Sequence, residues 1–391
     1  MLHRAGAPRG CPGVAGPGRN RGGRLLVRPP PHRRRRYRVR HAAAAHARPT
    51  PALPGENDHA HGGGDRYPFY ARLPREESTM TASAHREIDL PFDVLDGFTH
   101  HMVDVDGVTL HAVDGGVPEA PAVVLLAGVP QTWWAWHRVM PALAATHRVV
   151  ALDLPGQGHS DRPADGYDTL SVARLVRRAV ELLGVGEHWL VAHDVGAWVA
   201  TTYALDTPAA SGGPELLGLA LLDAGIPGVS LPTSVALDPA SAYKLAHFAF
   251  HLVPDLPETL ISGHEREYVA WFLTHKAAAP DVFSDAEIDR YARLFAAADG
   301  VRAILAYYRS VPESASRNRE LAAARKIDVP VSAISSDQGS IPDMAAAVRP
   351  LVGDAVDVLD VRVVGAGHFI PEEAPDQVVR AIEELVARSR P

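Results

Sequence analysis

Asp194 stands at the centre of a segment that predicts a strand, a sharp turn and a helix in immediate succession. The segment, residues 190–197, has the sequence LVAHDVGA. Ala192 and Gly196 are small enough to allow a strained turn that exposes the central side chain. The amide of Val195 would then face a developing oxyanion, so the carboxylate could attack carbon and the resulting ester could be hydrolysed. The simpler alternative is that Asp194 only caps the helix, because aspartate is common at that position.

His368 is the predicted general base. It lies in the glycine-rich loop VVGAGHFI, residues 363–370, directly after a predicted strand and after Asp194 in chain order. Hydrolases with a nucleophile turn of this form keep their histidine there, where it can activate the water that hydrolyses the ester. The alternative is a solvated surface histidine, since the chain contains 20 histidines.

An acid should orient this histidine and stabilise its protonated form. Asp337, in the loop ISSDQG at residues 334–339, is the preferred candidate because it follows a predicted strand and precedes the histidine. Asp343 in the same loop and Asp223, at the end of an earlier predicted strand, remain alternatives. Asp337 could instead be only a turn residue beside Gly339.

The segment GVPQTWWAW, residues 128–136, follows another predicted strand. We predict that the amide of Val129 faces the same oxyanion as the amide of Val195, so that the two form an oxyanion hole. Trp133 and Trp134 are predicted to line an apolar substrate pocket, although tryptophans at this spacing also occur in cores.

Aromatic side chains are also expected from a helical region of the chain. Tyr308 ends the helical pattern at residues 303–309. Its phenol could donate a proton to an oxygen leaving group, or it could be an amphipathic tyrosine at a helix end. Phe248 and Phe250, in the segment HFAF at residues 247–250, are predicted to line the substrate pocket.

The elements that must position these residues alternate between strands and helices. From His101 onward, short β-branched runs alternate with helical patterns, which predicts a mainly parallel α/β sheet covered by helices. After a strand ending near Asp223 the alternation stops, and a helical insertion of this kind predicts a cap over the carboxyl ends of the strands. The predicted organisation is an α/β-hydrolase-like core at residues 90–225 and 325–391 with a helical cap at residues 226–324. The predicted strands are residues 102–105, 108–113, 122–127, 148–153, 188–193, 217–223, 329–335 and 360–364.

Charge separates the N-terminal segment from the rest of the chain. Residues 1–79 hold 16 Arg and 5 acidic residues, a net charge of +11, whereas the remainder has a net charge of −18. The segment is rich in Pro, Gly and Arg without an apolar period, so we predict that it is disordered. No apolar run follows the arginines as a secretory signal requires, and we expect no nucleic-acid partner. Translation that starts at Met80 would be the simplest explanation of this segment.

Composition narrows the function classes further. Hydrophobic residues make up 46% and charged residues 22%, as in globular proteins, and no run of eighteen apolar residues predicts a membrane span. Cys11 is the only cysteine, so residues 80–391 have no disulfide or thiolate nucleophile, which fits a reducing cytoplasm. Histidines at metal-ligand spacing and phosphate loops are not found, so we expect no metal and no organic cofactor. The expected partner is a small-molecule substrate, and the sequence allows a homo-oligomer.

Together these motifs resemble the epoxide hydrolase and dehalogenase branch of the α/β-hydrolase superfamily, over about residues 101–387. The motifs are HDxGA at 193–197, GxPQxWxxW at 128–136, LPGxGxS at 154–160 and GH at 367–368. The resemblance implies a two-step reaction, in which the aspartate opens the substrate at carbon and histidine-activated water then hydrolyses the ester.

The resemblance also implies two cap tyrosines that protonate the leaving oxygen. Tyr308, in a Tyr-Arg pair, matches one of them, but residues 248–251 contain no tyrosine to match the other. Epoxide hydrolases usually have histidine where this chain has Ala127.

Two classes of function remain. The first is hydrolysis of an epoxide or a related small apolar electrophile through an ester on Asp194, with a haloacid or haloalkane dehalogenase as the alternative enzyme. Val195 argues against the alternative, since dehalogenases of this branch place Trp or Arg after the nucleophile and a halide needs N–H donors or cations. The second class is a non-catalytic protein that binds a small ligand under its cap, which the departures at Ala127 and residues 248–251 suggest.

Overall fold

The computed structural model describes residues 90–206, 213–234 and 239–389, with only the backbone described at residues 239–242. The predicted disordered segment, residues 1–79, lies outside this part of the chain. Among the helices of the described residues, none has both the length and the apolar character that crossing a bilayer requires.

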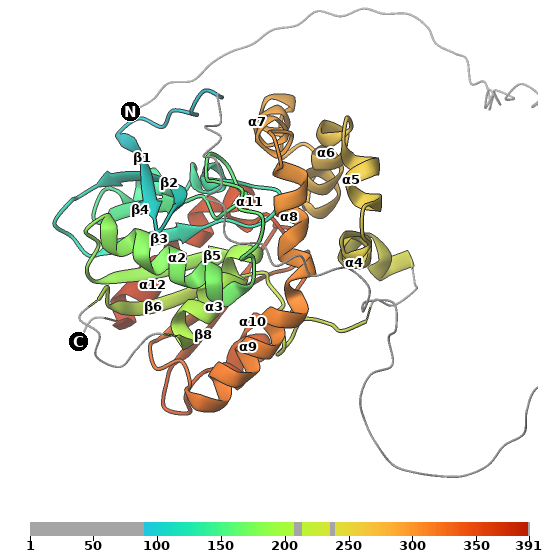
Figure 1. Cartoon of the computed structure of the whole chain (residues 1–391). Coiled ribbons are helices and arrows are strands. Elements are labelled where there is room, and N and C mark those ends of the chain that lie inside the picture. Colours follow the sequence, from blue (N-terminus) through green and yellow to red (C-terminus); the bar gives the residue numbers. More distant parts are fainter. Residues whose placement is uncertain (1–89, 207–212, 235–238, 390–391) are drawn as a thin grey trace, which may run out of the picture. The chain divides into compact units, whose positions relative to one another are not determined.

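An eight-stranded sheet forms the centre of the fold, in the order β1-β2-β4-β3-β5-β6-β7-β8 (Figure 1). β1 pairs antiparallel with β2, and β2 pairs antiparallel with β4; every later pair is parallel. The predicted mainly parallel sheet is therefore confirmed. The strands are β1 (Phe98–Val105), β2 (Val108–Gly116), β3 (Ala122–Leu126), β4 (Arg148–Leu152), β5 (His188–His193), β6 (Leu216–Leu222), β7 (Val331–Ser336) and β8 (Val358–Val363).

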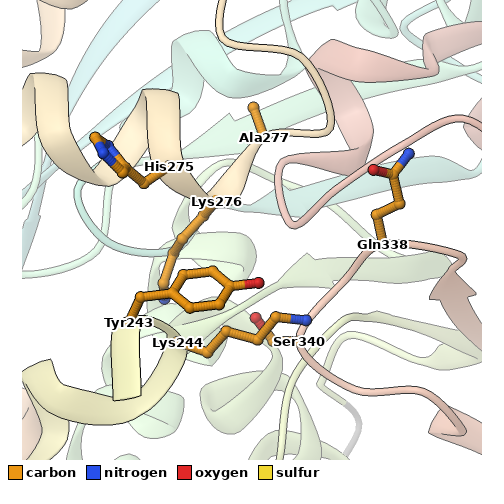
Figure 2. A pocket seen from close by; sticks show the side chains of 7 residues that line it. All are labelled: Tyr243, Lys244, His275, Lys276, Ala277, Gln338 and Ser340. Atoms are coloured by element: carbon orange, nitrogen blue, oxygen red, sulfur yellow. The ribbon is translucent and has the colours of Figure 1, made fainter. Parts of the chain in front are cut away.

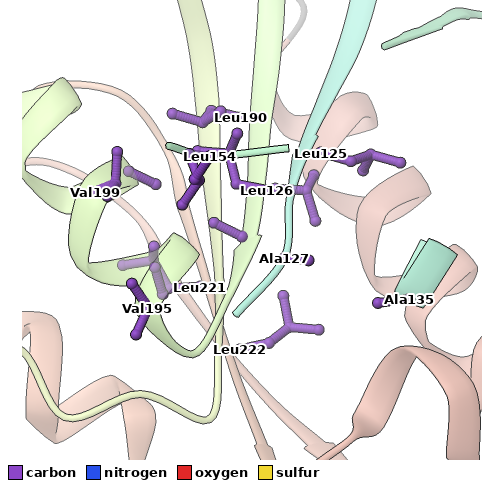
Figure 3. Close-up of a cluster of buried hydrophobic side chains, with 14 of the residues drawn as sticks. Leu125, Leu126, Ala127, Ala135, Leu154, Leu190, Val195, Val199, Leu221 and Leu222 are labelled. Atoms are coloured by element: carbon purple, nitrogen blue, oxygen red, sulfur yellow. The ribbon is translucent and has the colours of Figure 1, made fainter. Parts of the chain in front are cut away.

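The central strands are buried along their whole length because helices cover both faces of the sheet. All residues of β3 and β5 are buried. Figure 3 shows Leu126 of β3 and Leu190 of β5 in one apolar cluster with Val199 of the following helix. Between β1 and β2, Asp106 and Gly107 have φ angles of 53° and 89°, as a two-residue Asp-Gly hairpin turn requires.

The helices of the core lie on the two faces of the sheet, with α2 and α3 in front and α12 behind in Figure 1. Asp168 caps α2, since its side chain accepts hydrogen bonds from the amides of Leu170 and Ser171. The core helices are α1 (Met140–Leu143), α2 (Thr169–Leu182), α3 (Val195–Leu205), α10 (Met344–Val348), α11 (Ile370–Glu373) and α12 (Pro375–Ser389), with 3-10 turns η1 (Trp133–Trp136) and η2 (Arg349–Leu351).

A helical insertion separates β6 from β7, as predicted. We call this insertion the cap. Its helices are α4 (Pro239–Leu252), α5 (Leu256–Ile261), α6 (Glu265–Lys276), α7 (Asp285–Phe295), α8 (Gly300–Arg309) and α9 (Val311–Ala324).

A buried acid joins the cap to the core. Glu372, in α11, accepts a hydrogen bond from the hydroxyl of Tyr291 in α7 at 2.8 Å, and another from the side-chain amide of Gln131. On the same helix α7, Arg293 forms an ion pair with Asp93 at 2.6 Å. These contacts hold α7 against the core near the predicted oxyanion loop.

The burial of the central strands predicts which residues stabilise the fold. Leu125 is 0% exposed in β3, so Leu125→Ala should lower the free energy of unfolding by about 2–5 kcal/mol, through lost burial and the cavity left behind. Leu260→Ala is the matched control, because Leu260 is 55% exposed in α5, and its effect should stay within about 0.5 kcal/mol. Urea denaturation of the two variants measures both values; equal losses would contradict the described packing.

Candidate active site

Asp194 lies at the turn between β5 and α3, with φ 52° and ψ −123°. A positive φ is uncommon for a residue with a Cβ and costs about 1–3 kcal/mol, so the surrounding structure must impose it. Two glycines let the neighbouring backbone approach closely enough. A Cβ on Gly196 would lie 2.6 Å from the carbonyl oxygen of Leu126, and a Cβ on Gly128 would lie 2.2 Å from the Cβ of Asp194.

The two carboxylate oxygens of Asp194 have different neighbours. Oδ1 accepts a hydrogen bond from the amide of Val129 at 2.8 Å, whereas Oδ2 lies 3.5 Å from Nε2 of His368. Burial raises the pKa of this carboxyl, but the contact with His368 and the nearby Lys276 outweigh burial and hold the pKa well below its usual value. Asp194 is therefore ionised at neutral pH, and the ionised form is the one that can attack carbon.

Asp223 is the acid that contacts the imidazole of His368. It follows β6, and its Oδ2 accepts a hydrogen bond from Nδ1 of His368 at 2.6 Å. The backbone amides of Ser340 and Ile341 donate to the same carboxylate at 2.8 and 2.7 Å. Burial and the charge of Lys276 lower the pKa of His368, but its contacts with Asp194 and Asp223 outweigh both, so this pKa is raised.

The preference for Asp337 as the orienting acid is corrected by these contacts. The carboxylate of Asp337 instead accepts hydrogen bonds from the amides of Gly365 (3.1 Å) and Ala366 (3.3 Å), so it shapes the loop that carries the histidine without reaching the ring. Asp343, the other residue of this loop that was considered, caps α10 by accepting a hydrogen bond from the amide of Ala346.

His193 holds the backbone of His368 in place and was not singled out from the sequence. Nε2 of His193 donates to the carbonyl oxygen of His368 at 2.8 Å, and the two ring centroids are 4.7 Å apart. Burial, followed by the charge of His368, lowers the pKa of His193 to about 4. Its ring is therefore neutral at neutral pH, and one of its nitrogens carries no proton.

A buried His–Asp group supports the oxyanion loop. Asp153, directly after β4, accepts hydrogen bonds from the amide of Trp133, from Nδ1 of His111 (both 2.7 Å) and from the amide of His159 (3.2 Å). One possible ligand atom from each of His111, Asp153 and His159 lies within 4.8 Å of the other two, a spacing at which a metal could bind. Because the carboxylate of Asp153 already accepts hydrogen bonds from the backbone amides of Trp133 and His159, we interpret the group as a support for the oxyanion loop.

The residues predicted to line an apolar pocket occupy two different places. Trp133 and Trp134 are buried in the core; the ring of Trp133 contacts His100, and Trp134 stacks on His137. Both rings therefore pack among buried side chains beside the oxyanion loop, and their place in a substrate pocket stays a prediction. Phe248 and Phe250 belong to the cap, where Phe248 contacts Tyr308 and Phe250 contacts Tyr268.

Tyr308 is buried in an aromatic cluster at the end of α8. Its ring centroid lies 4.3 Å from that of His251, 5.4 Å from Phe248 and 5.9 Å from Trp198 in α3. Burial and the charge of Asp194 raise its pKa well above the usual value for a phenol, so the hydroxyl keeps its proton. The structure thus places Tyr308, the predicted proton donor, beside α3, the helix that follows Asp194.

His247 is a further polar group of this cluster that the sequence analysis missed. Its ring centroid lies 5.6 Å from that of Tyr308, and the residue is buried. Burial and then the charges of Lys276 and His251 lower its pKa, so the ring is a neutral imidazole with one N–H to donate. Its spacing of four residues from His251, on one face of α4, is the signal that could have identified it.

A cavity of about 300 Å³ opens between the cap and the loop after β7 (Figure 2). It lies beside the His368 site, because the carbonyl oxygen of Lys276 accepts a hydrogen bond from the amide of His368 at 2.8 Å. The residues that line it are Tyr243, Lys244, His275, Lys276, Ala277, Gln338 and Ser340.

Known proteins share this fold and much of its sequence. Residues 121–375 match the alpha/beta hydrolase fold family. A soluble epoxide hydrolase of Corynebacterium sp. (strain C12) is 32% identical over 72% of this chain and 94% of its own length. A fluoroacetate dehalogenase of Burkholderia sp. is 27% identical over 76% of this chain and 96% of its own length. The crystal structure of Cfl2 from Burkholderia cenocepacia has a TM-score of 0.70 and 51% identity, covering 75% of this chain and 96% of that one.

The corrected position of the orienting acid can be tested on the histidine itself. Asp223→Asn should lower the pKa of His368, because the imidazolium loses the carboxylate that stabilises it. Asp337→Asn, the matched control, should leave that pKa unchanged, since its carboxylate bonds only backbone amides of the loop. Imidazole NMR signals followed against pH measure both values, with His368→Gln to assign the signal; a shift in the Asp337→Asn protein alone would reinstate Asp337.

Proposed function

Because this chain belongs to the epoxide hydrolase and dehalogenase branch of the α/β-hydrolase superfamily, we propose that it hydrolyses epoxides through a covalent ester on Asp194. One observation carries the proposal. An ionised aspartate occupies the nucleophile turn, with one oxygen on a backbone amide and the other facing a histidine paired with a second acid.

In the first step, Oδ2 of Asp194 attacks a ring carbon of the epoxide, and the C–O bond of the ring breaks. The electron pair of that bond leaves on oxygen, which must gain a proton to become a hydroxyl. Tyr308 and His247 are the proposed donors, since Tyr308 contacts Trp198 of α3, His247 contacts Tyr308, and both side chains keep a proton at neutral pH. His247 in this role would replace the second cap tyrosine that the chain lacks.

In the second step, His368 removes a proton from water, and the resulting hydroxide attacks Cγ of the ester. The negative charge then develops on Oδ1, which already accepts a hydrogen bond from Val129. Val195 is the first residue of α3, where an amide has no partner within its helix, and we propose it as the second donor. Asp223 stabilises the imidazolium that forms. When the intermediate collapses, the bond between Cγ and the ester oxygen breaks, the electron pair leaves on that oxygen, and the imidazolium of His368 protonates it to release the diol and restore the carboxylate.

The proton donors favour an epoxide over a halide as the leaving group. A departing alkoxide needs a proton, which a phenol and an imidazole can supply, whereas a halide ion needs only N–H donors or cations around it. The relative described as a fluoroacetate dehalogenase makes dehalogenation the second candidate. Halide release measured on haloacids and haloalkanes separates the two.

Trapping the ester tests the proposed nucleophile. A His368→Gln protein should accumulate the ester, because attack on the epoxide does not need the histidine but hydrolysis of the ester does. Intact mass after brief mixing with a panel of epoxides should therefore rise by the mass of one epoxide, and peptide mapping should place the adduct on Asp194.

The control is the double variant His368→Gln, Asp194→Asn, which should gain no mass. An adduct on another residue would refute the mechanism. A folded protein that forms no adduct with epoxides, haloacids or haloalkanes would favour the alternative of a non-catalytic ligand-binding protein.

The proposed proton donors are tested by the rate of ester formation. In the His368→Gln background, Tyr308→Phe and His247→Phe should each slow adduct formation with an epoxide by roughly 100-fold, the usual contribution of a general acid. Tyr307→Phe is the matched control, since the hydroxyl of Tyr307 donates to the carbonyl oxygen of Pro155 in the core. Rapid-quench mass spectrometry measures these rates, and equal rates in the Tyr308→Phe and Tyr307→Phe proteins would remove Tyr308 from the mechanism.

A further inference from the structure

Lys276, the last residue of α6, is a buried lysine without an acidic partner. The residue is 8% exposed, and among the described residues its ammonium group has no hydrogen bond or ion pair. Its Nζ lies 5.2 Å from the centroid of the Phe272 ring. An unpaired buried cation costs several kcal/mol of desolvation, so buried lysines are normally paired.

Lys276 is one of the residues that line the cavity between the cap and the loop after β7. Lys244 of α4 and Lys276 of α6 both line this cavity, with Gln338 and Ser340 on the facing loop (Figure 2). The chain contains three lysines among its 39 basic residues, so two of the three line this one cavity. Lys244 uses its ammonium group to bond the carbonyl oxygen of Gly339 at 2.9 Å, which leaves Lys276 as the unpaired cation.

This cavity is adjacent to the reacting groups on two sides. The backbone of Lys276 bonds the amide of His368, and the amide of Ser340 donates to the carboxylate of Asp223 at 2.8 Å. Burial lowers the pKa of Lys276 below its usual value, and the negative charges of Asp194 and Asp223 only partly offset this effect. The backbone of Lys276 and the amide of Ser340 thus connect the wall of the cavity to His368 and Asp223.

A negatively charged group on the substrate would supply the partner that the ammonium group of Lys276 lacks. Without Lys276, the two carboxylates of Asp194 and Asp223 would repel a negatively charged substrate. A carboxylate can accept hydrogen bonds from the ammonium of Lys276 and from the neutral donors Gln338 and Ser340, and its charge of −1 matches one unpaired lysine.

We propose that Lys276 binds a carboxylate carried by the substrate, so that the natural substrates are epoxides of small organic acids. This inference rests on the proposed epoxide hydrolysis, and it goes beyond it by naming the substrate class and the residue that selects it. The cavity holds the carboxylate while Asp194 attacks the epoxide carbon.

The selectivity test compares 4,5-epoxypentanoate with its amide, which differ in charge and hardly in size. The unaltered protein should have a higher kcat/KM for the acid, and Lys276→Met should lower that value by about 10- to 100-fold, the usual value of a charge-assisted hydrogen bond. The amide should lose only what the weaker ionisation of Asp194 costs, so the ratio of kcat/KM for the acid over that for the amide should fall by about 10- to 100-fold in the Lys276→Met protein. Lys326→Met is the matched control, because Lys326 lies on the surface, bonded to the carbonyl oxygen of Pro350, and should change neither value.

An equal loss for acid and amide in the Lys276→Met protein would overturn the proposal, since a merely structural lysine would affect both substrates. Thermal denaturation separates this result from misfolding. Removing an unpaired buried charge should leave the melting temperature unchanged or raise it, because the desolvation cost disappears.

Binding is measured on the unaltered protein without turnover. Butanoate should protect Lys276, but not Lys326, from acetylation, and mass spectrometry resolves the three lysines of the chain. Butanamide should give no protection. Protection by inorganic phosphate and not by butanoate would contradict the carboxylate assignment.

The two experiments together separate the proposals. Protection by butanoate in a protein that consumes no epoxide would retain the carboxylate site and reject epoxide hydrolysis. Equal hydrolysis of acid and amide without protection would retain epoxide hydrolysis and reject the carboxylate site.

Discussion

The structure depends on keeping an ionised carboxylate buried at Asp194. Burial opposes ionisation, so the site must supply donors and positive charge: the amide of Val129 donates to the carboxylate at 2.8 Å, Nε2 of His368 lies at 3.5 Å, and the charge of Lys276 acts in the same direction. The turn must also hold a positive φ, which is possible only because Gly128 and Gly196 let β3 and its loop approach. The close approach that strains the backbone is thus the same one that delivers the Val129 amide to the carboxylate.

Each group that stabilises this anion is itself held by a second layer of buried polar contacts. Asp223 fixes the ring of His368 and is fixed by two backbone amides, while His193 fixes the His368 carbonyl group. Asp153 bonds the amide of Trp133 in the oxyanion loop and so ties that loop to β4. Because every loop at this edge of the sheet is bonded to another, their relative positions vary little and the site is preorganised.

The local motifs of the core were predictable from the sequence, whereas only part of what the cap brings to the site, Tyr308 and Phe248, was. The strand runs, the HDVG turn and the histidine loop are local patterns, which decide structure within a few residues. The choice between Asp223 and Asp337 is not local, since β6 and β7 are neighbours and both acids leave the same edge of the sheet. β7 pairs with β8 up to Ser336, and Asp337 comes directly after it. The carboxylate of Asp337 therefore bonds the amide of Gly365, in the loop after β8, and does not reach the ring of His368. Likewise, the positions of His247 and Lys276 depend on how α4 and α6 pack against the rest of the protein. The helical period of the sequence alone does not determine this packing.

Core and cap carry charges of opposite sign where they meet. The core presents the carboxylates of Asp194 and Asp223, and the cap presents Lys276 together with the neutral donors His247 and Tyr308. A nucleophile that must stay ionised gains from a cation on the facing wall, because their attraction is strong where water is excluded. The same cation offsets the repulsion that a charged substrate would meet. The lysine that helps to ionise the nucleophile therefore also decides which substrates can approach it, and a change in the cap can alter substrate charge preference without altering the nucleophile turn.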